Sequence, residues 1–266
     1  MKKLLLAIGA LSMITACSTN AVTGRKSFNV VGNATIFPQS FTQYREVLSS
    51  AKVETGTKNA NLVQTVGERI KYAADKYYAD KGLSAQLKDY EWEFRLLQAN
   101  EVNAWCMPGG KVAVYTGILP ITKDANGLAV VMGHEIGHAL ANHSAEQMSQ
   151  QYGMSILGSV VGSAAGNSTW GTAFAKYYPV VGQVGLLSYS RKMELDADLT
   201  GLYLMAMAGY DPSAAVPFWE RMSAAGSGGT TEFLSTHPSD ATRIAKITEA
   251  LPTAMAYYNA SPYKGK

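Results

Sequence analysis

Cysteine is scarce in this chain, which has two among 266 residues, Cys17 and Cys106. Two cysteines permit at most one intrachain disulfide, so a small disulfide-stapled scaffold is excluded. If Cys17 is modified, as argued below, Cys106 has no partner within the chain. We then expect Cys106 to be a small buried side chain near a substrate-binding strand; an intermolecular disulfide is the alternative.

The chain also lacks an apolar run long enough to cross a membrane, which takes roughly 20 residues. The run from residue 4 to 16 is too short, and the run from 153 to 166 is interrupted by glycine and serine. An enzyme built from membrane-spanning helices is therefore not expected. The wider segment 153–187 is glycine-rich with Lys176 as its sole charge, and two interpretations stay open. It forms buried helical segments with a loop, or a mobile apolar lid or contact surface over a site.

Neither sign of charge dominates, because 23 Lys and Arg face 20 Asp and Glu, a formal net charge of +3. Removal of residues 1–16 would take Lys2 and Lys3 and leave +1. With no basic block, nucleic acid is not an expected partner. No internal repeat is evident, and about 250 residues fit one large domain.

The N-terminus has the pattern of a secretory signal peptide, with Lys2 and Lys3 before the apolar run Leu4–Ala16. The residues Ile14–Cys17 resemble a bacterial lipobox, in which cleavage exposes a cysteine that carries acyl chains. More than one acyl chain anchors a protein stably, and Ser18 rather than aspartate after the cysteine indicates the outer membrane. We therefore expect a protein tethered by lipid at Cys17 to the bacterial outer membrane and facing the periplasm. A plain signal peptide with a chance cysteine is the alternative.

Residues 134–138 read His-Glu-Ile-Gly-His. Apolar residues recur around them at three- and four-residue steps, which predicts a helix that Asp124 or Asn126 can cap. On such a helix His134 and His138 share one face and can bind a single metal ion. Glu135 lies beside them as a candidate general base. The alternative is a buried helix with two incidental histidines, which would leave several polar groups to satisfy in an apolar setting.

A second helix is predicted about fifty residues later, where Glu194 and Asp198 are four residues apart and share a face. Glu194 could complete the three protein ligands that catalytic zinc prefers. Asp198 could accept a hydrogen bond from the far nitrogen of a ligating histidine. Asp196 points elsewhere and is expected to be solvated. The alternative is that all three acids form a charged helix face.

Together with Ser235–Ser239 and Arg243, these two motifs resemble the gluzincin metallopeptidase family that contains HtpX and the CAAX prenyl proteases. The likeness is greatest to its soluble bacterial branch of periplasmic lipoproteins, typified by BepA and LoiP. It runs from about residue 60 to 250 and includes further matches at Asn103-Ala104, Pro108–Gly110, Val114–Gly117 and Ala208–Pro212. The prenyl proteases themselves have spanning helices that this chain lacks.

The resemblance implies one Zn2+ per chain, with Glu194 as the third ligand and Asp198 as the hydrogen-bond partner of a ligating histidine. It makes His237 and Arg243 candidates for stabilising the oxyanion, with His237 also able to bind the metal; a purely structural His237 at a helix start is the alternative. The strand with Asn103-Ala104 is expected to pair with extended substrate. His143, five residues after His138, is expected to be structural.

The fold class is α+β: a mainly helical zincin-type domain with a small antiparallel sheet beside the metal-binding helix. Residues 1–16 are assigned to the signal peptide, 17–39 to a polar irregular tether and 40–266 to a single peptidase domain. Helices are expected at 40–52, 59–79, 124–151, 192–208, 212–224 and 239–250. A strand is predicted at 90–97, and a hairpin turning at Gly109-Gly110 joins 102–105 to 112–115.

The function expected from these features is hydrolysis of peptide bonds in unfolded or misassembled envelope proteins, as protein quality control. A non-enzymatic chaperone-like or assembly module that keeps zinc for stability is the competing class. Loss of Glu135 or of a ligand would favour that class, and all of them are present.

Overall fold

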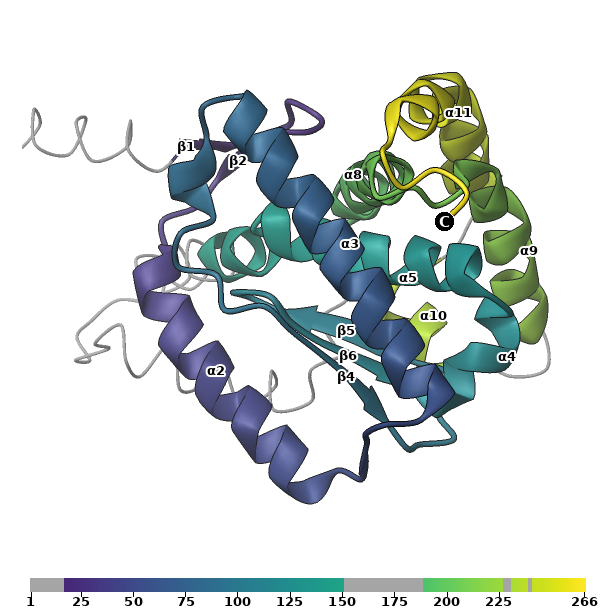
Figure 1. The fold of residues 1–266 in the computed structure, drawn as a ribbon. Coiled ribbons are helices and arrows are strands. Elements are labelled where there is room, and N and C mark those ends of the chain that lie inside the picture. The colour runs from purple at the N-terminus through teal and green to yellow at the C-terminus, as the bar shows by residue number, and fades with distance from the viewer. Residues whose placement is uncertain (1–16, 151–188, 227–230, 239–240) are drawn as a thin grey trace, which may run out of the picture.

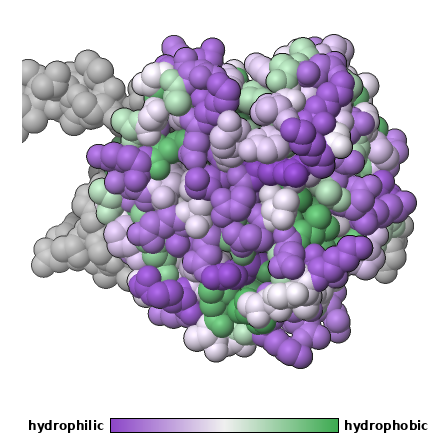
Figure 2. Space-filling model, viewed as in Figure 1, coloured by the Kyte–Doolittle hydropathy of each residue, from purple (hydrophilic) through white to green (hydrophobic). Residues whose placement is uncertain are grey.

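A computed structural model describes residues 17–150, 189–226, 231–238 and 241–266 (Figure 1). The segment 153–187, for which a lid or buried helices were predicted, lies outside the described residues. Within the described part, no helix has the length and hydrophobicity needed to span a membrane. The face seen in Figure 2 is largely hydrophilic, with small separate hydrophobic areas.

The expected α+β class is confirmed, since helices surround a small mixed sheet. The sheet has the strand order β3 (Val53–Glu54), β4 (Glu93–Leu97), β6 (Lys111–Tyr115), β5 (Ala104–Met107). Strands β5 and β6 form the predicted antiparallel hairpin, whereas β4 and β6 run parallel. Gly109 and Gly110 have φ of 86° and 91°, which L-residues rarely adopt, so this turn requires glycine.

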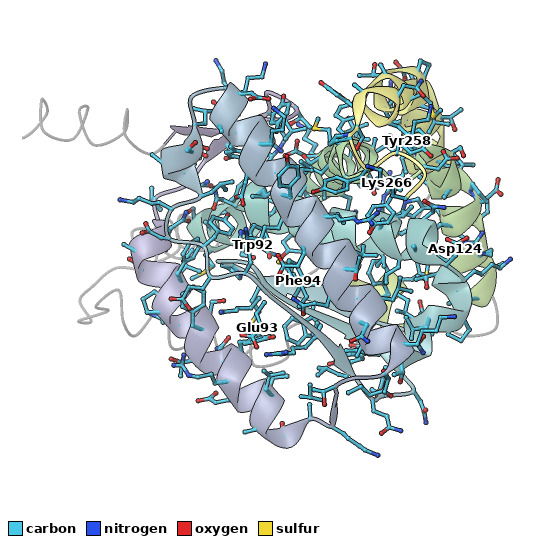
Figure 3. All side chains as sticks on the ribbon, viewed as in Figure 1. Trp92, Glu93, Phe94, Asp124, Tyr258 and Lys266 are labelled. Carbon is cyan, nitrogen blue, oxygen red and sulfur yellow. The ribbon has the colours of Figure 1, made fainter. Side chains whose placement is uncertain are left out.

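Side chains alternate between the two faces of the sheet, as the period of a strand demands. Phe94, Leu96 and Val112 point into the main core, to which α3 (Lys58–Asp80) and α5 (Ala125–Leu140) contribute. Leu97 and Trp105 point the other way and pack with residues of α2 (Asn33–Ser50). Figure 1 shows α3 crossing the strands, and Figure 3 marks Glu93 and Phe94 on β4 and Asp124 at the start of α5. Strand β5 is left at the sheet edge among the described strands.

The predicted helix at 59–79 agrees closely with α3, which Thr57 caps by accepting a hydrogen bond from Ala60 N. The helix at 192–208 agrees with α8 (Arg191–Met207). The remaining helical bounds are η1 (Ser84–Gln86), η2 (Thr116–Ile118), α4 (Leu119–Thr122), η3 (Pro212–Ala214), α9 (Ala215–Gly226), α10 (Glu232–Thr236) and α11 (Ala241–Ala260).

The single helix predicted for 124–151 is wrong in one respect, because α5 ends at Leu140 and residues 143–150 form a separate helical stretch. Between them Asn142 adopts a left-handed φ of 55°, a conformation that asparagine tolerates better than most residues. Asp124, one of the two proposed caps, accepts hydrogen bonds from Asn126 N and Gly127 N.

The irregular structure predicted for 17–39 is also wrong. Strands β1 (Cys17–Thr19) and β2 (Lys26–Phe28) pair antiparallel, and α2 begins at Asn33. Polar side chains between the strands, those of Asn20, Thr23 and Arg25, bind a buried partner on α8, described below. The domain boundary at residue 39 stays a prediction.

Helices α5 and α8 pack closely because glycines lie in the contact between them. A Cβ added to Gly201 would lie 2.5 Å from the carbonyl carbon of Gly133 and 2.6 Å from the backbone nitrogen of His134. A Cβ on Gly137 would lie 2.7 Å from the carbonyl oxygen of Ala197. Backbone therefore packs on backbone at this crossing, with no flexible side chain that could move aside.

We expect Gly201→Ala to lower the free energy of unfolding by about 1–3 kcal/mol, the usual cost of overpacking a core. The added methyl must push α8 away from α5, which outweighs the gain in helix propensity. Chemical denaturation measures the change. Gly32→Ala is the control, since a Cβ there meets nothing within 4 Å; equal stability of both variants would contradict the close packing.

Candidate active site

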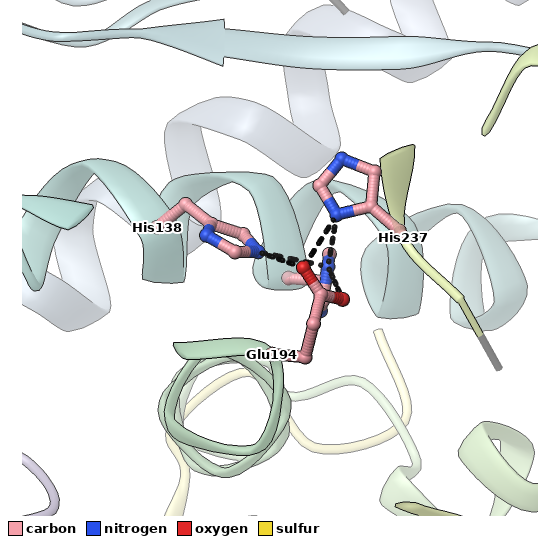
Figure 4. A group of neighbouring side chains, drawn as sticks. His138, Glu194 and His237 are labelled. Atoms are coloured by element: carbon pink, nitrogen blue, oxygen red, sulfur yellow. Dashed lines mark hydrogen bonds and ion pairs between the residues drawn. The ribbon is translucent and has the colours of Figure 1, made fainter. Parts of the chain in front are cut away.

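Four side chains from three parts of the fold converge on one point, and Figure 4 labels three of them, His138, Glu194 and His237. His134 and His138 come from adjacent turns of α5, Glu194 comes from the first turn of α8, and His237 is the C-cap residue that follows α10. All four are buried, and one ligand atom from each lies within 4.8 Å of the others.

The distances among these atoms are those of groups that face a common centre. His134 Nε2 lies 3.1 Å from His138 Nε2 and 3.2 Å from His237 Nδ1. Glu194 Oε1 lies 3.0 Å from His237 Nδ1 and 3.4 Å from His138 Nε2. Imidazole nitrogens and a carboxylate oxygen are the donor set that zinc prefers in tetrahedral sites. The residues fit a zinc ion, with His237 as a fourth donor beside the predicted three.

Asp198 contacts the Nδ1 side of His134, and Arg243 in turn binds Asp198. Asp198 Oδ1 lies 2.9 Å from His134 Nδ1, the position predicted for it. Arg243 donates two hydrogen bonds of 2.7 Å to the Asp198 carboxylate. Burial raises the pKa of Asp198, but the charge and hydrogen bonds of Arg243 outweigh it and the pKa is lowered. Asp198 is therefore a carboxylate that fixes a proton on His134 Nδ1 and leaves Nε2 free to bind metal.

Arg243 was a candidate for stabilising the oxyanion, but its contacts are with other residues of the site. Besides Asp198, its Nη1 lies 3.0 Å from Glu194 Oε2 and 2.8 Å from the carbonyl oxygen of Pro238. The guanidinium also lies over the ring of Trp219, 4.3 Å from the centroid. This geometry favours positioning of Asp198 and Glu194 over contact with a substrate.

Asp196 was expected to be solvated, and this is wrong: it is 3% exposed. Its Oδ2 lies 3.0 Å from Nε2 of His143, whose Nδ1 lies 2.9 Å from His138 Nδ1. The physical reason is that Asp196 has buried partners: the break at Asn142 brings His143 within reach, and Asn20 and Arg25 reach Asp196 from the N-terminal segment. His143, for which a structural role was expected, thus contacts a candidate metal ligand directly.

Glu135 lies beside the four converging side chains without joining them. Its Oε1 is 3.6 Å from His237 Nε2 and, among the described residues, accepts no hydrogen bond. The carboxylate also receives a hydrogen bond from the backbone N–H of Cys106 on β5. Burial raises the pKa of Glu135, more than the nearby His237 and His134 lower it. A carboxylate with a raised pKa is suited to accept and release a proton near neutral pH.

Burial and neighbouring charges shift the pKa values of the histidines and of Glu194 in the site. Burial lowers the pKa of His237, but Glu135 and Glu194 raise it further, and the net direction is up. Burial raises the pKa of Glu194, but His237 and His138 outweigh it and the pKa falls. Burial lowers the pKa of both His138 and His143, so both are neutral near pH 7.

The predicted substrate strand borders this centre. Ala104 begins β5, and its N–H donates to the side-chain oxygen of the buried Asn103. The carbonyl of Val102 accepts a hydrogen bond from Phe233 N at the start of α10. Strand β5 and the residues just before it thus contact both the helix that carries Glu135 and the segment that carries His237. Cys106, on the same strand, is buried as predicted, and burial raises the pKa of its thiol well above the usual range.

Sequence reasoning missed the aromatic surroundings of the histidines. Tyr189 stacks on His138 with ring centroids 4.1 Å apart, and its hydroxyl lies 3.1 Å from Ser144 Oγ. Trp219 packs edge-on against His134, 5.3 Å between centroids. No spacing in the sequence connects these residues to the motif, because they reach it only through the tertiary fold.

A helix-borne His-Glu-x-x-His pair with a glutamate from a following helix defines a metallopeptidase of the gluzincin class. Residues 65–251 match the model of Peptidase family M48. The chain belongs to this family, which confirms the expectations of a metalloendopeptidase and of zinc as its cofactor.

Relatives support this membership. The chain is 35% identical over 254 residues to the mitochondrial metalloendopeptidase OMA1 of Schizosaccharomyces pombe, covering 94% of this chain and 71% of that protein. It is 34% identical over 193 residues to that of Saccharomyces cerevisiae, covering 69% and 54%. The β-barrel assembly-enhancing protease of Escherichia coli is 29% identical over 161 residues, covering 58% of this chain and 33% of that protein.

The expected localisation, a lipid anchor in the bacterial outer membrane facing the periplasm, is contradicted by these relatives. The proteins that match over most of this chain are named as mitochondrial enzymes. The bacterial assembly-enhancing protease matches at lower identity over a shorter part. The family-level resemblance is therefore confirmed, and the narrower assignment to a periplasmic lipoprotein branch is not. A short motif such as Ile14–Cys17 could not carry that assignment by itself.

We expect Glu194→Ala to weaken zinc retention strongly, because it removes the carboxylate donor and leaves the charge of Arg243 without this partner. Metal content after dialysis against a chelator measures the effect. Glu93→Ala is the control, since this half-buried glutamate pairs with Arg95 on the sheet. Zinc content that is unchanged in Glu194→Ala would remove Glu194 from the site.

Proposed function

We propose that the protein hydrolyses peptide bonds within unfolded or misassembled proteins, as a quality-control endopeptidase. The observation that carries the proposal is the position of Glu135, which lies beside the four converging side chains and accepts a hydrogen bond from the backbone N–H of Cys106 on strand β5. The names of its relatives, metalloendopeptidases and an assembly-enhancing protease, support the same kind of activity.

His134, His138 and Glu194 are the proposed zinc ligands. Zinc, when bound, acts as a Lewis acid toward a peptide carbonyl and lowers the pKa of water to about 7. Glu135 accepts the proton of the attacking water and then delivers it to the leaving amine. Its raised pKa suits both transfers.

His237 is proposed to stabilise the oxyanion. Its raised pKa favours the charged form, and its Nε2 points toward Glu135, next to where the reacting carbonyl would lie. A charged donor placed there stabilises the negative charge that develops in the transition state. The competing role is a fourth zinc ligand through Nδ1, which faces His134 and Glu194.

Substrate binding is proposed at the edge of β5, near Asn103 and Ala104. An open strand edge binds main chain through hydrogen bonds regardless of sequence, so it selects unfolded or flexible segments. Chaperone-like action with structural zinc is the alternative function. The buried Glu135 speaks against it, because a purely structural site gains nothing from an additional buried carboxylate.

Glu135→Gln tests the mechanism. The amide cannot accept the proton, so we expect hydrolysis of unfolded casein to fall by at least about 10²-fold, while zinc content and thermal stability stay near wild type. Glu93→Gln is the control for loss of a carboxylate elsewhere. Casein cleavage by Glu135→Gln at a near wild-type rate would refute Glu135 as the base and leave the chaperone-like reading in place.

His237→Ala separates the two roles of that residue. Loss of cleavage with zinc retained supports the oxyanion role, because only the transition state is affected. Weaker zinc binding with raised cleavage supports inhibitory ligation. Chelator competition and the casein assay on the same preparation distinguish them.

Cys17 stays the proposed attachment point for an acyl chain, without a compartment assigned. We expect the N-terminal peptide of the purified full-length product to begin at Cys17 and to carry the added mass of acyl groups. Mass spectrometry of wild type and Cys17→Ser decides, and an unmodified cysteine in the wild type would end the proposal.

A further inference from the structure

Residues 20–25 form a closed turn between β1 and β2. Asn20 N donates to the carbonyl of Arg25 at 2.8 Å, and Gly24 N donates to the carbonyl of Asn20 at 2.9 Å. Gly24 has φ of 75°, which closes the turn. The turn therefore holds the side chains of Asn20, Thr23 and Arg25 on one side as a preformed set.

All three side chains bind Asp196 on α8, more than 170 residues away in sequence. Asn20 Nδ2 donates to Asp196 Oδ1 at 3.0 Å, and the Thr23 hydroxyl donates to the same oxygen. Arg25 Nε donates to Asp196 Oδ2 at 2.7 Å, and its Nη atoms pair with Glu146. Both carboxylate oxygens of Asp196 thus have hydrogen-bond partners, which fixes the orientation of this side chain.

Asp196 is connected to the metal centre by a chain of hydrogen bonds through His143. A histidine that binds zinc through Nε2 keeps its proton on Nδ1, so His138 donates from Nδ1 to His143 Nδ1, 2.9 Å away. His143 then donates from Nε2 to Asp196 Oδ2 at 3.0 Å. Only one set of proton positions satisfies this chain, and it leaves the Nε2 lone pair of His138 directed at the metal position.

The two histidines of α5 are held in parallel ways. His134 is fixed by Asp198 and Arg243, which comes from the C-terminal helix. His138 is fixed through His143 by Asp196, whose arginine comes from the N-terminal turn. Polar partners of metal ligands typically contribute 10- to 100-fold in metal affinity. Nothing in the function described above uses the N-terminal turn.

We propose that the turn 20–25 is a positioning element of the metal centre, with Arg25 orienting His138 through Asp196 and His143. The proposal rests on the ligand role of His138 and not on the identity of the substrate. Its consequence is that the N-terminal segment, 109 residues before the first ligand in sequence, sets how tightly the enzyme holds zinc.

The test measures the zinc dissociation constant of the full chain by competition with a chelator, without any peptide substrate. We expect Arg25→Met to weaken zinc binding about tenfold. Lys26→Met is the matched control, since it removes an adjacent, exposed positive charge that has no part in these contacts. The d–d spectrum of the cobalt-substituted protein should change in Arg25→Met and stay unchanged in Lys26→Met.

A merely structural role of Arg25 makes a different prediction. It would lower the melting temperature equally with and without zinc, whereas positioning reduces the rise that zinc produces. Zinc affinity of Arg25→Met within about twofold of wild type, below the range for such partners, would overturn the proposal. Should Arg25→Met not fold, Thr23→Val removes one hydrogen bond to Asp196, and unchanged zinc affinity there would overturn it equally.

The variant His138→Ala distinguishes failure of the ligand assignment from failure of the positioning role. Undiminished zinc affinity in His138→Ala would show that His138 is not a ligand, and the proposal would fall with it. A weakened His138→Ala beside an unaffected Arg25→Met would refute the positioning role alone. Neither result depends on whether casein is a substrate.

Discussion

The site depends on the direct backbone contact between α5 and α8. Gly133, Gly137 and Gly201 carry no side chain, so the two backbones can pack directly against each other. Because of this contact, a carboxylate as short as that of Asp198 can reach His134 Nδ1. One helix alone supplies two histidines and a base, and the other supplies their carboxylates. The metal centre is therefore a property of the crossing rather than of either motif.

The two aspartates of α8 that orient the histidines pair with arginines from opposite ends of the chain. Arg243 belongs to α11 and Arg25 to the turn before β2, yet each neutralises one aspartate of α8. Buried carboxylates are costly unless they are paired and hydrogen-bonded. Asp196 and Asp198 satisfy that condition only when both chain ends are in place. The spacing Asp-x-Asp on α8 thus serves two histidines that lie one turn apart on α5.

Local sequence patterns predicted much of this arrangement and failed where tertiary contacts decide. The periodicity around His134 and Leu195 located α5 and α8, and Gly109-Gly110 located the hairpin, because these signals are contained in a few neighbouring residues. The solvated Asp196 was wrong, since its partners at 20–25 are remote in sequence and look like an ordinary polar loop. The break at Asn142 was missed because the apolar periodicity continues across it. Tyr189 and Trp219 carried no signal, as aromatic contacts have no fixed spacing.

The balance of buried charge explains why the fold and the metal belong together. Glu135, Glu146, Glu194, Asp196 and Asp198 are all buried, and the guanidinium groups that pair among them are Arg25 and Arg243. These five carboxylates outnumber the two guanidinium groups, and burial raises the pKa of Glu135. A divalent cation at the centre offsets most of the excess, so zinc binding contributes to folding as well as to chemistry. Burial keeps Glu135 ready to take up a proton, which is the property that its proposed catalytic role requires.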